Sequence, residues 1–217
     1  MTPAPHLSFG LALTACAGFA DAVGFIVLGG HYVSFMSGNT TQLGDAFAAG
    51  AWSAASLAGA LVALFFGGSF GGSLLALIAG PRWGSAAVTL LVFATLALTL
   101  GLAWAGVAPA STMLVLAAGA GAQNAILPST GSVRLGTTFV TGTLFNAGLD
   151  LARALRGFAP PWRWAQHLLV WGSLMLGAVA GSAVFTQAGV WSLFVPAAIY
   201  LCFAAAFVLR PPSMVIR

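Results

Sequence analysis

Six long apolar stretches constrain this sequence more than any other feature. They cover approximately residues 8–28, 53–79, 85–106, 110–128, 165–186 and 190–209. About 20 apolar residues make a helix that is long enough to cross the hydrocarbon core of a bilayer. Because lipid offers the backbone no hydrogen bonds, helices are the structure expected for such stretches. The sequence therefore predicts an all-α integral membrane protein, with residues 1–217 as a single membrane domain and the lipid bilayer as its partner.

The composition excludes a soluble fold. Hydrophobic residues make up 60% of the 217 residues, charged residues make up only 5%, and the mean hydropathy is +1.01. A soluble domain carries about 25% charged residues, so a water-solvated surface cannot be assembled from this sequence. The net charge of +4 comes from seven arginines against three aspartates, and the arginines form no basic run. We therefore expect no nucleic-acid partner.

The sequence lacks the residue patterns of common enzymes. Cys16 and Cys202 both fall inside apolar stretches and have no metal-ligand spacing. The glycine-rich run 67–72 lacks the lysine of a phosphate-binding loop. We therefore expect no catalytic residues, no metal, no cofactor and no enzymatic activity.

Two further segments, 32–50 and 132–157, are studded with Ser, Thr, Asn, Gln and Asp side chains. Both contain internal glycines, among them Gly38 in the first and Gly142 in the second. Interrupted helices of this kind occur in transporters, where they line a cavity inside the protein. We expect two short discontinuous or re-entrant segments, with Gly38 and Gly142 at or beside helix breaks near the middle of the membrane.

The two halves of the chain resemble each other. Residues 18–22 align with 121–125, 35–38 with 139–142, 68–73 with 177–182, and 79–80 with 188–189, all in the same order. Internal repeats are typical of transporter folds. We interpret the pattern as a duplication, with repeat halves at approximately 8–106 and 110–210.

The arginines predict the topology. If each polar segment returns to the side from which it enters, the chain has six transmembrane helices, and all seven arginines share one side with both termini. These are Arg82, Arg134, Arg153, Arg156, Arg163, Arg210 and Arg217. The positive-inside rule then makes both termini cytoplasmic, in a multi-pass protein of a bacterial inner membrane, and the halves form an inverted 3+3 repeat. The alternative is eight spans in a parallel 4+4 repeat, which divides the arginines between the two sides.

Two blocks carry a family resemblance. Residues 17–25, Ala-Gly-Phe-Ala-Asp-Ala-Val-Gly-Phe, and residues 35–41, Phe-Met-Ser-Gly-Asn-Thr-Thr, resemble the YoaK family of small bacterial membrane proteins. The resemblance covers essentially the whole chain, and Ser-Gly-Asn-Thr-Thr is its most specific part. It implies six transmembrane helices. Because that family is grouped under a domain of unknown function, the resemblance implies no substrate and no reaction.

Asp21 is the one acid in the middle of a long apolar stretch. A carboxylate at that depth must face protein or water, and intramembrane acids often bind protons or cations. Its counterpart in the second half is Asn124, which cannot titrate. We expect Asp21 to face the protein interior, within hydrogen-bond reach of residues 37–42. A structural hydrogen bond to a neighbouring helix is the alternative role.

The other candidate site residues come from the two polar segments. They are Ser37, Gly38, Asn39, Thr40, Thr41 and Gln42 in the first segment, and Thr141, Gly142, Thr143 and Asn146 in the second. With Asp21 and Asn124 they predict a substrate or proton site, whose small-molecule substrate the sequence does not identify. Secondary transport, with or without proton coupling, is the favoured function. The alternatives are an hourglass-type channel and a non-transporting scaffold, in which polar side chains only bridge helices.

Two GxxxG patterns predict close helix packing. Gly68 and Gly72 form one, and Gly177 and Gly181 form the other. These faces can pack within one chain or between chains of a homo-oligomer, and the sequence leaves both open.

Two further predictions concern titratable side chains in the second half of the chain. Asp150 and Arg153 lie three residues apart and are expected to pair on one helix. His167 is expected to be an interfacial hydrogen-bonding group.

Overall fold

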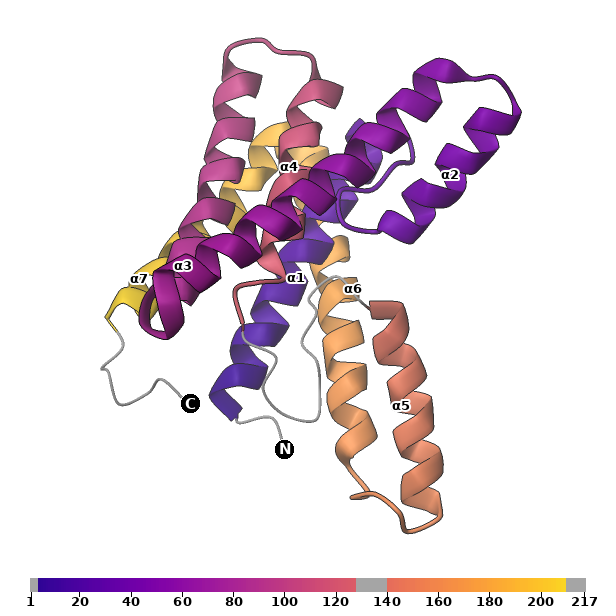
Figure 1. Cartoon of the computed structure of the whole chain (residues 1–217), viewed down its shortest axis with the longest axis vertical. Helices are drawn as coiled ribbons and strands as arrows, with labels where there is room; N and C mark the ends of the chain where they lie inside the picture. Colours follow the sequence, from indigo (N-terminus) through magenta and orange to yellow (C-terminus); the bar gives the residue numbers. More distant parts are fainter. Residues whose placement is uncertain (1–3, 128–139, 210–217) are drawn as a thin grey trace.

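Helices account for nearly all the regular structure of this chain. The computed structural model describes residues 4–127 and 140–209. Within these residues it contains α1 (Ala4–Val27), α2 (Met36–Ala48), α3 (Trp52–Trp104), α4 (Pro109–Gln123), α5 (Val140–Leu155), α6 (Arg163–Ala188), the 3-10 helix η1 (Gly189–Leu193) and α7 (Phe194–Val208) (Figure 1). Three stretches of the described residues are long and apolar enough to cross a membrane: Leu7–Val27, Trp52–Trp104 and Arg163–Val208. The predicted all-α membrane fold is therefore confirmed.

The longest helix, α3, is two helices joined at a sharp bend. Gly80 has a φ of 72° and a ψ of 178°, a backbone conformation that side chains other than glycine rarely allow. Pro81 follows, and proline cannot donate the hydrogen bond that would continue the helix. The bend divides α3 at the boundary that the sequence predicted between stretches 53–79 and 85–106.

The first polar segment forms a short helix after an irregular loop. The chain leaves α1 at Val27, passes through residues 28–35, and begins α2 at Met36. The 13 residues of α2 rise about 20 Å, which is less than the thickness of a bilayer core. The α2 helix by itself is therefore too short to cross a bilayer core. Gly38 lies two residues after the start of α2, beside a helix end as predicted.

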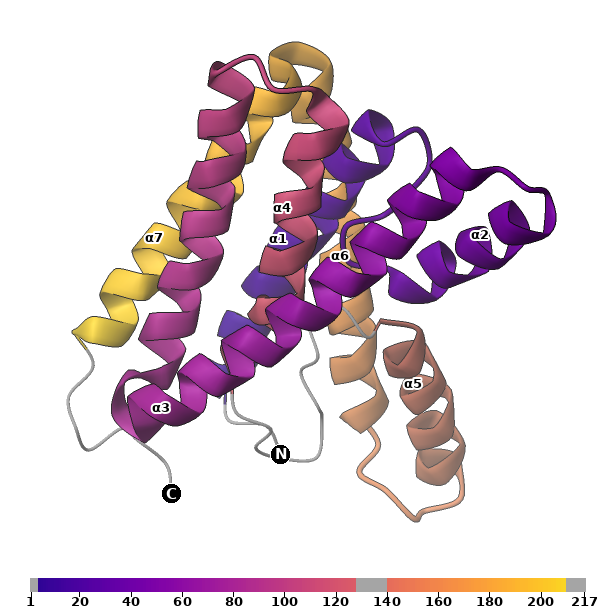
Figure 2. The ribbon, with the colours of Figure 1, turned by 45° about the horizontal axis from the view of Figure 1, so that its top comes forward.

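The second polar segment contains α5, which has 16 residues and carries Gly142 as its third residue. Residues 128–139, including the first part of this segment and Arg134, lie outside the described residues. Figures 1 and 2 show that α2 and α5 both begin near the middle of the molecule and run outward in opposite directions, each folding back onto the helix that follows it.

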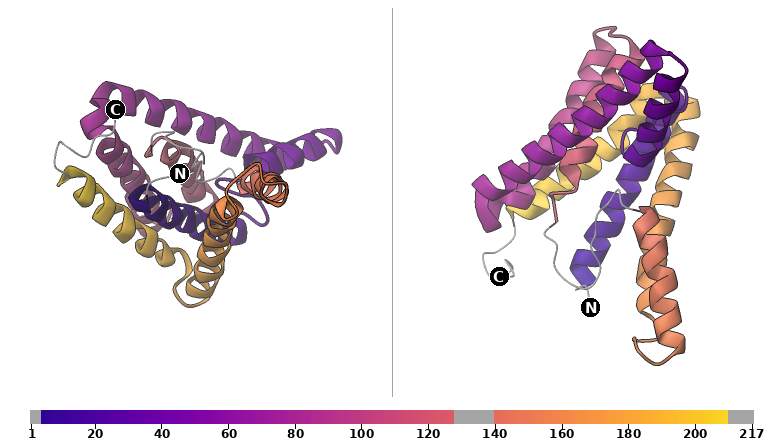
Figure 3. Two further views of the ribbon diagram at one scale, coloured as in Figure 1. Left: turned by 90° about the horizontal axis from the view of Figure 1, so that it is seen from below. Right: turned by 45° about the vertical axis from the view of Figure 1, so that its right-hand side comes forward.

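The paths of the remaining helices are seen in three views. In Figure 1, α1 and α6 run upward, whereas α4 and α7 run downward. Viewed from below, α1 and α4 lie between α3 on one side and α6 and α7 on the other (Figure 3). The core of the protein is therefore built around α1 and α4.

Small residues bring α1 and α6 into close contact. A Cβ atom placed on Gly177 would lie 2.0 Å from the carbonyl oxygen of Ala15, and one on Gly181 would lie 2.6 Å from that of Phe19. From the other side, a Cβ on Gly18 would lie 2.1 Å from the carbonyl oxygen of Leu174. Only glycine fits at these three positions, because the two backbones touch there.

The same packing joins α4 to the first part of α3. A Cβ on Gly68 would lie 1.9 Å from the carbonyl oxygen of Ala118, and one on Gly121 would lie 2.1 Å from that of Phe65. Gly72 packs in the same way on Ala122. Both GxxxG patterns thus pack within one chain, each against the first helix of the other half. A homo-oligomer through these faces stays an untested prediction.

A substitution on α6 tests these contacts. We expect Gly177→Ala to lower the free energy of unfolding by about 1–3 kcal/mol, because the added methyl group forces the two backbones apart. Gly172 lies on the same helix with no atom within 4 Å of an added Cβ. Gly172→Ala should therefore be neutral or slightly stabilising. Thermal unfolding of both variants in one detergent makes the comparison, and equal effects would contradict this packing.

Candidate functional site

Asp21 holds the irregular loop that leads into α2. Its Oδ1 accepts hydrogen bonds from the backbone N–H groups of Val33, at 2.9 Å, and Ser34, at 2.7 Å. Its Oδ2 accepts a third hydrogen bond from the Ser34 hydroxyl. Three donors therefore satisfy a carboxylate that would be costly to leave unpaired in an apolar surrounding. Asp21 contacts the interior of the protein, as the sequence predicted.

The partners of Asp21 differ from those expected. The sequence predicted contact with residues 37–42, but the carboxylate binds Val33 and Ser34, which precede α2. The reason is local: backbone N–H groups in an irregular loop have no helical partner, so they need an acceptor. The polar side chains of α2 bind the same loop through different groups. Asp21 and α2 therefore meet through the loop.

Asn39 is the α2 side chain most deeply involved in this arrangement. It is fully buried. Its Oδ1 accepts a hydrogen bond from the backbone N–H of Tyr32 at 3.0 Å, and its Nδ2 donates to the carbonyl oxygen of Tyr32 at 2.6 Å. Gln42 donates to the carbonyl oxygen of Gly30 at 2.9 Å. Two of the predicted site residues therefore fix the loop.

The other candidates on α2 are placed differently. Thr40 and Thr41 are exposed and donate their hydroxyls to carbonyl oxygens one turn back in their own helix. Ser37 is also exposed. Gly38 lies against the ring of Phe35, where a Cβ would come within 2.6 Å of the ring. These side chains are free to face lipid, water or a ligand, whereas Gly38 has a packing role.

The second half presents its candidates in a similar pattern. Thr143 is buried on the side of α5 that packs against α6, and Thr141, Gly142 and Asn146 are exposed. Asn124 ends α4 and donates to the carbonyl oxygens of Ala120 and Gly121, at 3.2 and 3.4 Å.

Gln123 is a functional candidate that sequence reasoning missed. Its Nε2 donates to the carbonyl oxygen of Leu13 at 2.9 Å, and its Oε1 accepts a hydrogen bond from the hydroxyl of Tyr200 at 2.5 Å. The side chain is only 3% exposed and joins α4 to α1 and α7. A large amide among small residues in an apolar stretch was the available signal, but the repeat alignment directed attention to the neighbouring Asn124.

A small cavity lies beside Gln123. Its volume is about 20 Å³, and its wall comes from α1, the loop before α2, the second part of α3, α4 and α7. The polar groups in the wall belong to Cys16, Thr95, Gln123 and Tyr200. Such a space admits about one water molecule. Val33 connects the cavity to the acid, because this residue is part of the cavity wall and its N–H donates a hydrogen bond to Asp21.

Asp150 forms a separate ionic cluster between α5 and α6. Arg163 donates from Nη2 to Oδ1 at 2.5 Å and from Nε to Oδ2 at 2.7 Å, whereas the expected partner, Arg153, lies 3.9 Å away and is half exposed. The expected pairing with Arg153 is therefore present, but only as a long contact. Arg163 is the stronger partner, because its guanidinium donates two short hydrogen bonds to the carboxylate. These hydrogen bonds from Arg163 hold the pKa of Asp150 below its usual range.

His167 belongs to the same cluster. Its Nε2 lies 3.3 Å from Oδ2 of Asp150, and the residue is only 4% exposed. The sequence indicated an interfacial histidine, but the structure buries it beside an acid. Its Nδ1 is buried without a hydrogen-bond partner.

Comparison with known proteins places the chain in a family. The family described as "Protein of unknown function (DUF1275)" matches residues 9–206. The chain belongs to this family. It is also 34% identical over 220 residues to the UPF0700 transmembrane protein RA0705 of Rhizobium meliloti (strain 1021), covering 92% of this chain and 87% of that relative. No solved structure matches.

These findings confirm a membrane family without an assigned function. The predicted membrane location agrees with the transmembrane description of the Rhizobium relative. The YoaK resemblance stays a prediction, because neither match carries that name.

Two substitutions of Asp21 separate its shape from its charge. Asp21→Asn keeps one oxygen, and Oδ1 alone accepts both backbone hydrogen bonds, so the loop should stay in place. Asp21→Ala leaves those donors unpaired and should lower the free energy of unfolding by about 3 kcal/mol. Asp45→Ala removes an exposed acid on α2 and serves as the control. If thermal unfolding finds Asp21→Ala as stable as the control, Asp21 does not hold the loop.

The ionic cluster should make stability depend on pH. Because the folded-state pKa of Asp150 is lowered, its contribution is complete above the usual pKa near 4 and is lost as the pH falls below that value. We therefore expect Asp150→Asn to unfold at a lower temperature than the native protein at pH 7. The difference should shrink as the pH falls below about 4. Arg163→Gln should behave like Asp150→Asn, whereas Arg153→Gln should not. An equal loss in both arginine variants would contradict the assigned pairing.

Proposed function

We propose that this protein is a secondary transporter, which moves a small molecule across a bacterial inner membrane by alternating access. The observation that carries the proposal is the pair of short polar helices, α2 and α5, which begin in the middle of the molecule (Figure 2). An irregular backbone at that depth is tolerated only inside protein or beside a water-filled cavity. Transporters commonly bind their substrates where such interrupted helices meet.

The arrangement of the helices supports an inverted 3+3 repeat. The order α1, α2 and the two parts of α3 is followed by α4, α5, α6 and α7, and corresponding helices run in opposite directions in Figure 1. The glycine contacts are reciprocal, because each half packs its GxxxG pattern against the first helix of the other. In a repeat of this kind, one half can rock against the other around a central site.

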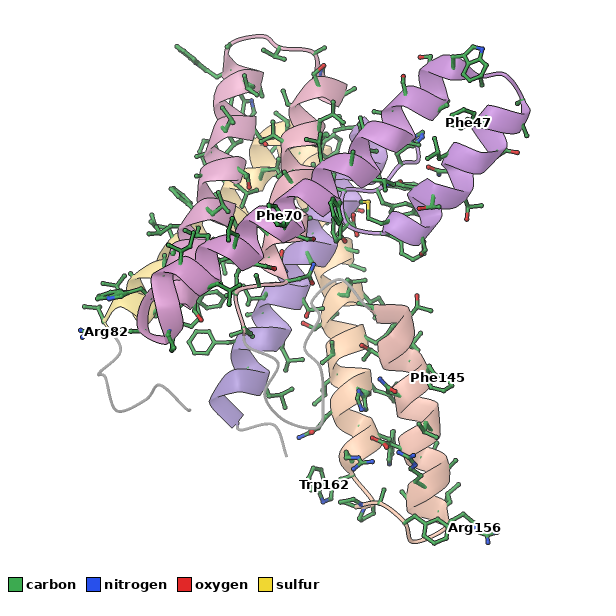
Figure 4. All side chains as sticks on the ribbon, in the orientation of Figure 1. Phe47, Phe70, Arg82, Phe145, Arg156 and Trp162 are labelled. Atoms are coloured by element: carbon green, nitrogen blue, oxygen red, sulfur yellow. The ribbon has the colours of Figure 1, made fainter. Side chains whose placement is uncertain are left out.

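The arginines support cytoplasmic termini. Arg82, Arg156 and Trp162 all lie toward the lower end of the molecule in Figure 4, the end at which α1 begins. Positively charged residues collect on the cytoplasmic side, and tryptophan prefers the membrane interface. The lower end in this view is therefore assigned to the cytoplasm.

Proton coupling at Asp21 is part of the proposal. A proton bound at Oδ2 would replace the hydrogen bond from the Ser34 hydroxyl, whereas Oδ1 would keep the two backbone hydrogen bonds from Val33 and Ser34. Protonation would remove the negative charge that strengthens these two bonds, so α2 and its loop would be held in place less tightly. This links the charge of one residue to the position of a polar helix.

Two other functions remain as alternatives. An hourglass-type channel would need a continuous path, whereas the cavity found here has room for about one water molecule. A scaffold would need only the packing and the polar bridges between helices. Asn39 and the glycine contacts suit that role as well, so the functions must be separated by experiment.

Cysteine accessibility distinguishes the three functions without knowledge of the substrate. We introduce Ser37→Cys on α2 or Thr141→Cys on α5, both exposed positions, in a Cys202→Ser protein reconstituted into vesicles. A membrane-impermeant thiol reagent is then added to one side at a time. For a carrier, we expect each cysteine to react mainly from one side, with an imposed pH gradient shifting the two rates in opposite directions.

The other outcomes overturn the proposal. If each of the two cysteine variants reacted equally fast from either side of the membrane, the protein would be a channel. Rates that no pH gradient or added metabolite changes would indicate a scaffold. Arg82→Cys provides the control for topology and should react only from the cytoplasmic side.

A further inference from the structure

The cavity beside Gln123 has walls that suit only one class of ligand. Its polar groups are an amide, a phenol hydroxyl, a threonine hydroxyl and a thiol, and no charged side chain of residues 4–127 and 140–209 lines it. Asp21 is the acid nearest along the chain to the wall residues of α1. Its carboxylate already accepts hydrogen bonds from the loop before α2. An ion in this space would be buried without a counter-charge, at a large cost in free energy.

The polar wall groups retain hydrogen-bonding capacity. The Gln123 amide uses one N–H on Leu13 and accepts from Tyr200, so its second N–H remains available. The Tyr200 oxygen can still accept a hydrogen bond. Thr95 donates its hydroxyl to Val92 and therefore presents lone pairs. The wall thus offers one donor and several acceptors to an occupant.

Glycine brings one of these groups close to the cavity. A Cβ on Gly119 would lie 2.2 Å from the hydroxyl oxygen of Thr95, so only glycine lets this hydroxyl approach α4. The residues that create the space are otherwise small or apolar. The combination of a mostly apolar wall and a few fixed polar groups is typical of binding sites for small molecules.

We propose that this cavity is a binding site for a small, uncharged, hydrogen-bonding molecule, and that the side chain of Val33 restricts access to it. The inference deepens the proposed transport function by naming the class of substrate. At about 20 Å³ the cavity holds one water molecule, so a larger solute needs part of the wall to move. Val33 is the wall residue that lies on a loop, whereas the other wall residues belong to helices. Val33 is fully buried, and its backbone is tied to Asp21. Release of the loop from Asp21 would therefore also widen the cavity.

Cys16 provides a reporter inside the wall. It is 3% exposed, and the only other cysteine of the chain, Cys202, can be replaced by serine. We treat the reconstituted Cys202→Ser protein with methyl methanethiosulfonate, which is small and neutral, or with its trimethylammonium-ethyl analogue, which is cationic. Intact-mass measurement gives the rate of labelling. We expect slow reaction with the neutral reagent and none with the cationic one.

Val33→Ala tests the restriction. This substitution should raise the rate of Cys16 labelling by the neutral reagent severalfold while leaving the cationic reagent without effect. Val23→Ala is the matched control, because Val23 is also fully buried and contributes nothing to the cavity wall. It should leave the rate unchanged. Equal rates in the two variants would overturn the role of Val33.

The comparison of the neutral reagent with the cationic one needs no substitution in the cavity wall. It therefore tests the binding site even if Val33→Ala fails to fold. Labelling by the cationic reagent at the rate of the neutral one would overturn the neutral binding site. Neither readout depends on transport. A protein that shows the expected labelling but no alternating access at Ser37→Cys and Thr141→Cys would keep this site and lose the proposed carrier function.

Discussion

The backbone of the loop of residues 28–35 depends on hydrogen bonds from buried side chains, and these hydrogen bonds join the loop to α1 and α2. A helix satisfies its own backbone, but this loop cannot, and lipid offers no substitute. Asp21 binds the N–H groups of Val33 and Ser34, and Asn39 binds both backbone groups of Tyr32. These side chains therefore supply hydrogen bonds that the backbone of residues 32–34 does not receive from a helix.

Close backbone contact provides the second requirement. Membrane helices gain little from burying apolar side chains, because lipid tails are equally apolar, so their association relies on tight packing. The contacts of Gly177 with α1 and of Gly68 with α4 supply it, and they join the two halves reciprocally. The loop and the glycine contacts are linked through α1, which carries both Gly18 and Asp21.

Much of this fold could be predicted from the sequence, because its strongest signals are those of single helices. Apolar length identified the spanning stretches, and Pro81 after Gly80 marked the bend in α3. The depth of Asp21 indicated that it faces protein. Partners in three dimensions were harder to predict. Asp21 binds backbone N–H groups. Nearly every residue has such a group, so the residue types in the sequence do not show which of them Asp21 binds.

The partners that sequence analysis missed have the same physical origin. Asp150 does pair with Arg153 at 3.9 Å, as helical spacing predicted, but its stronger partner is Arg163, which lies 13 residues away on the next helix. Gln123 was missed because its role depends on Leu13 and Tyr200, from two other helices. Periodicity describes one helix at a time, whereas a site between helices depends on how several cross.

The proposed halves differ chemically, and this difference bears on mechanism. Gly44 and Gly148 align with each other in the proposed repeat, and so do Gly68 and Gly177. Counted from these pairs, Asp150 corresponds to Ala46, and His167 corresponds to Ala58. Both alanines are buried where α2 packs on α3, so the first hairpin is held by apolar contact and the second by ions. In the first half, the acid that accepts hydrogen bonds from the interior is instead Asp21, on α1, and it binds the loop of residues 28–35. The two hairpins therefore cannot respond equally to protons, and inward-facing and outward-facing states of such a carrier would differ in free energy even without a substrate gradient.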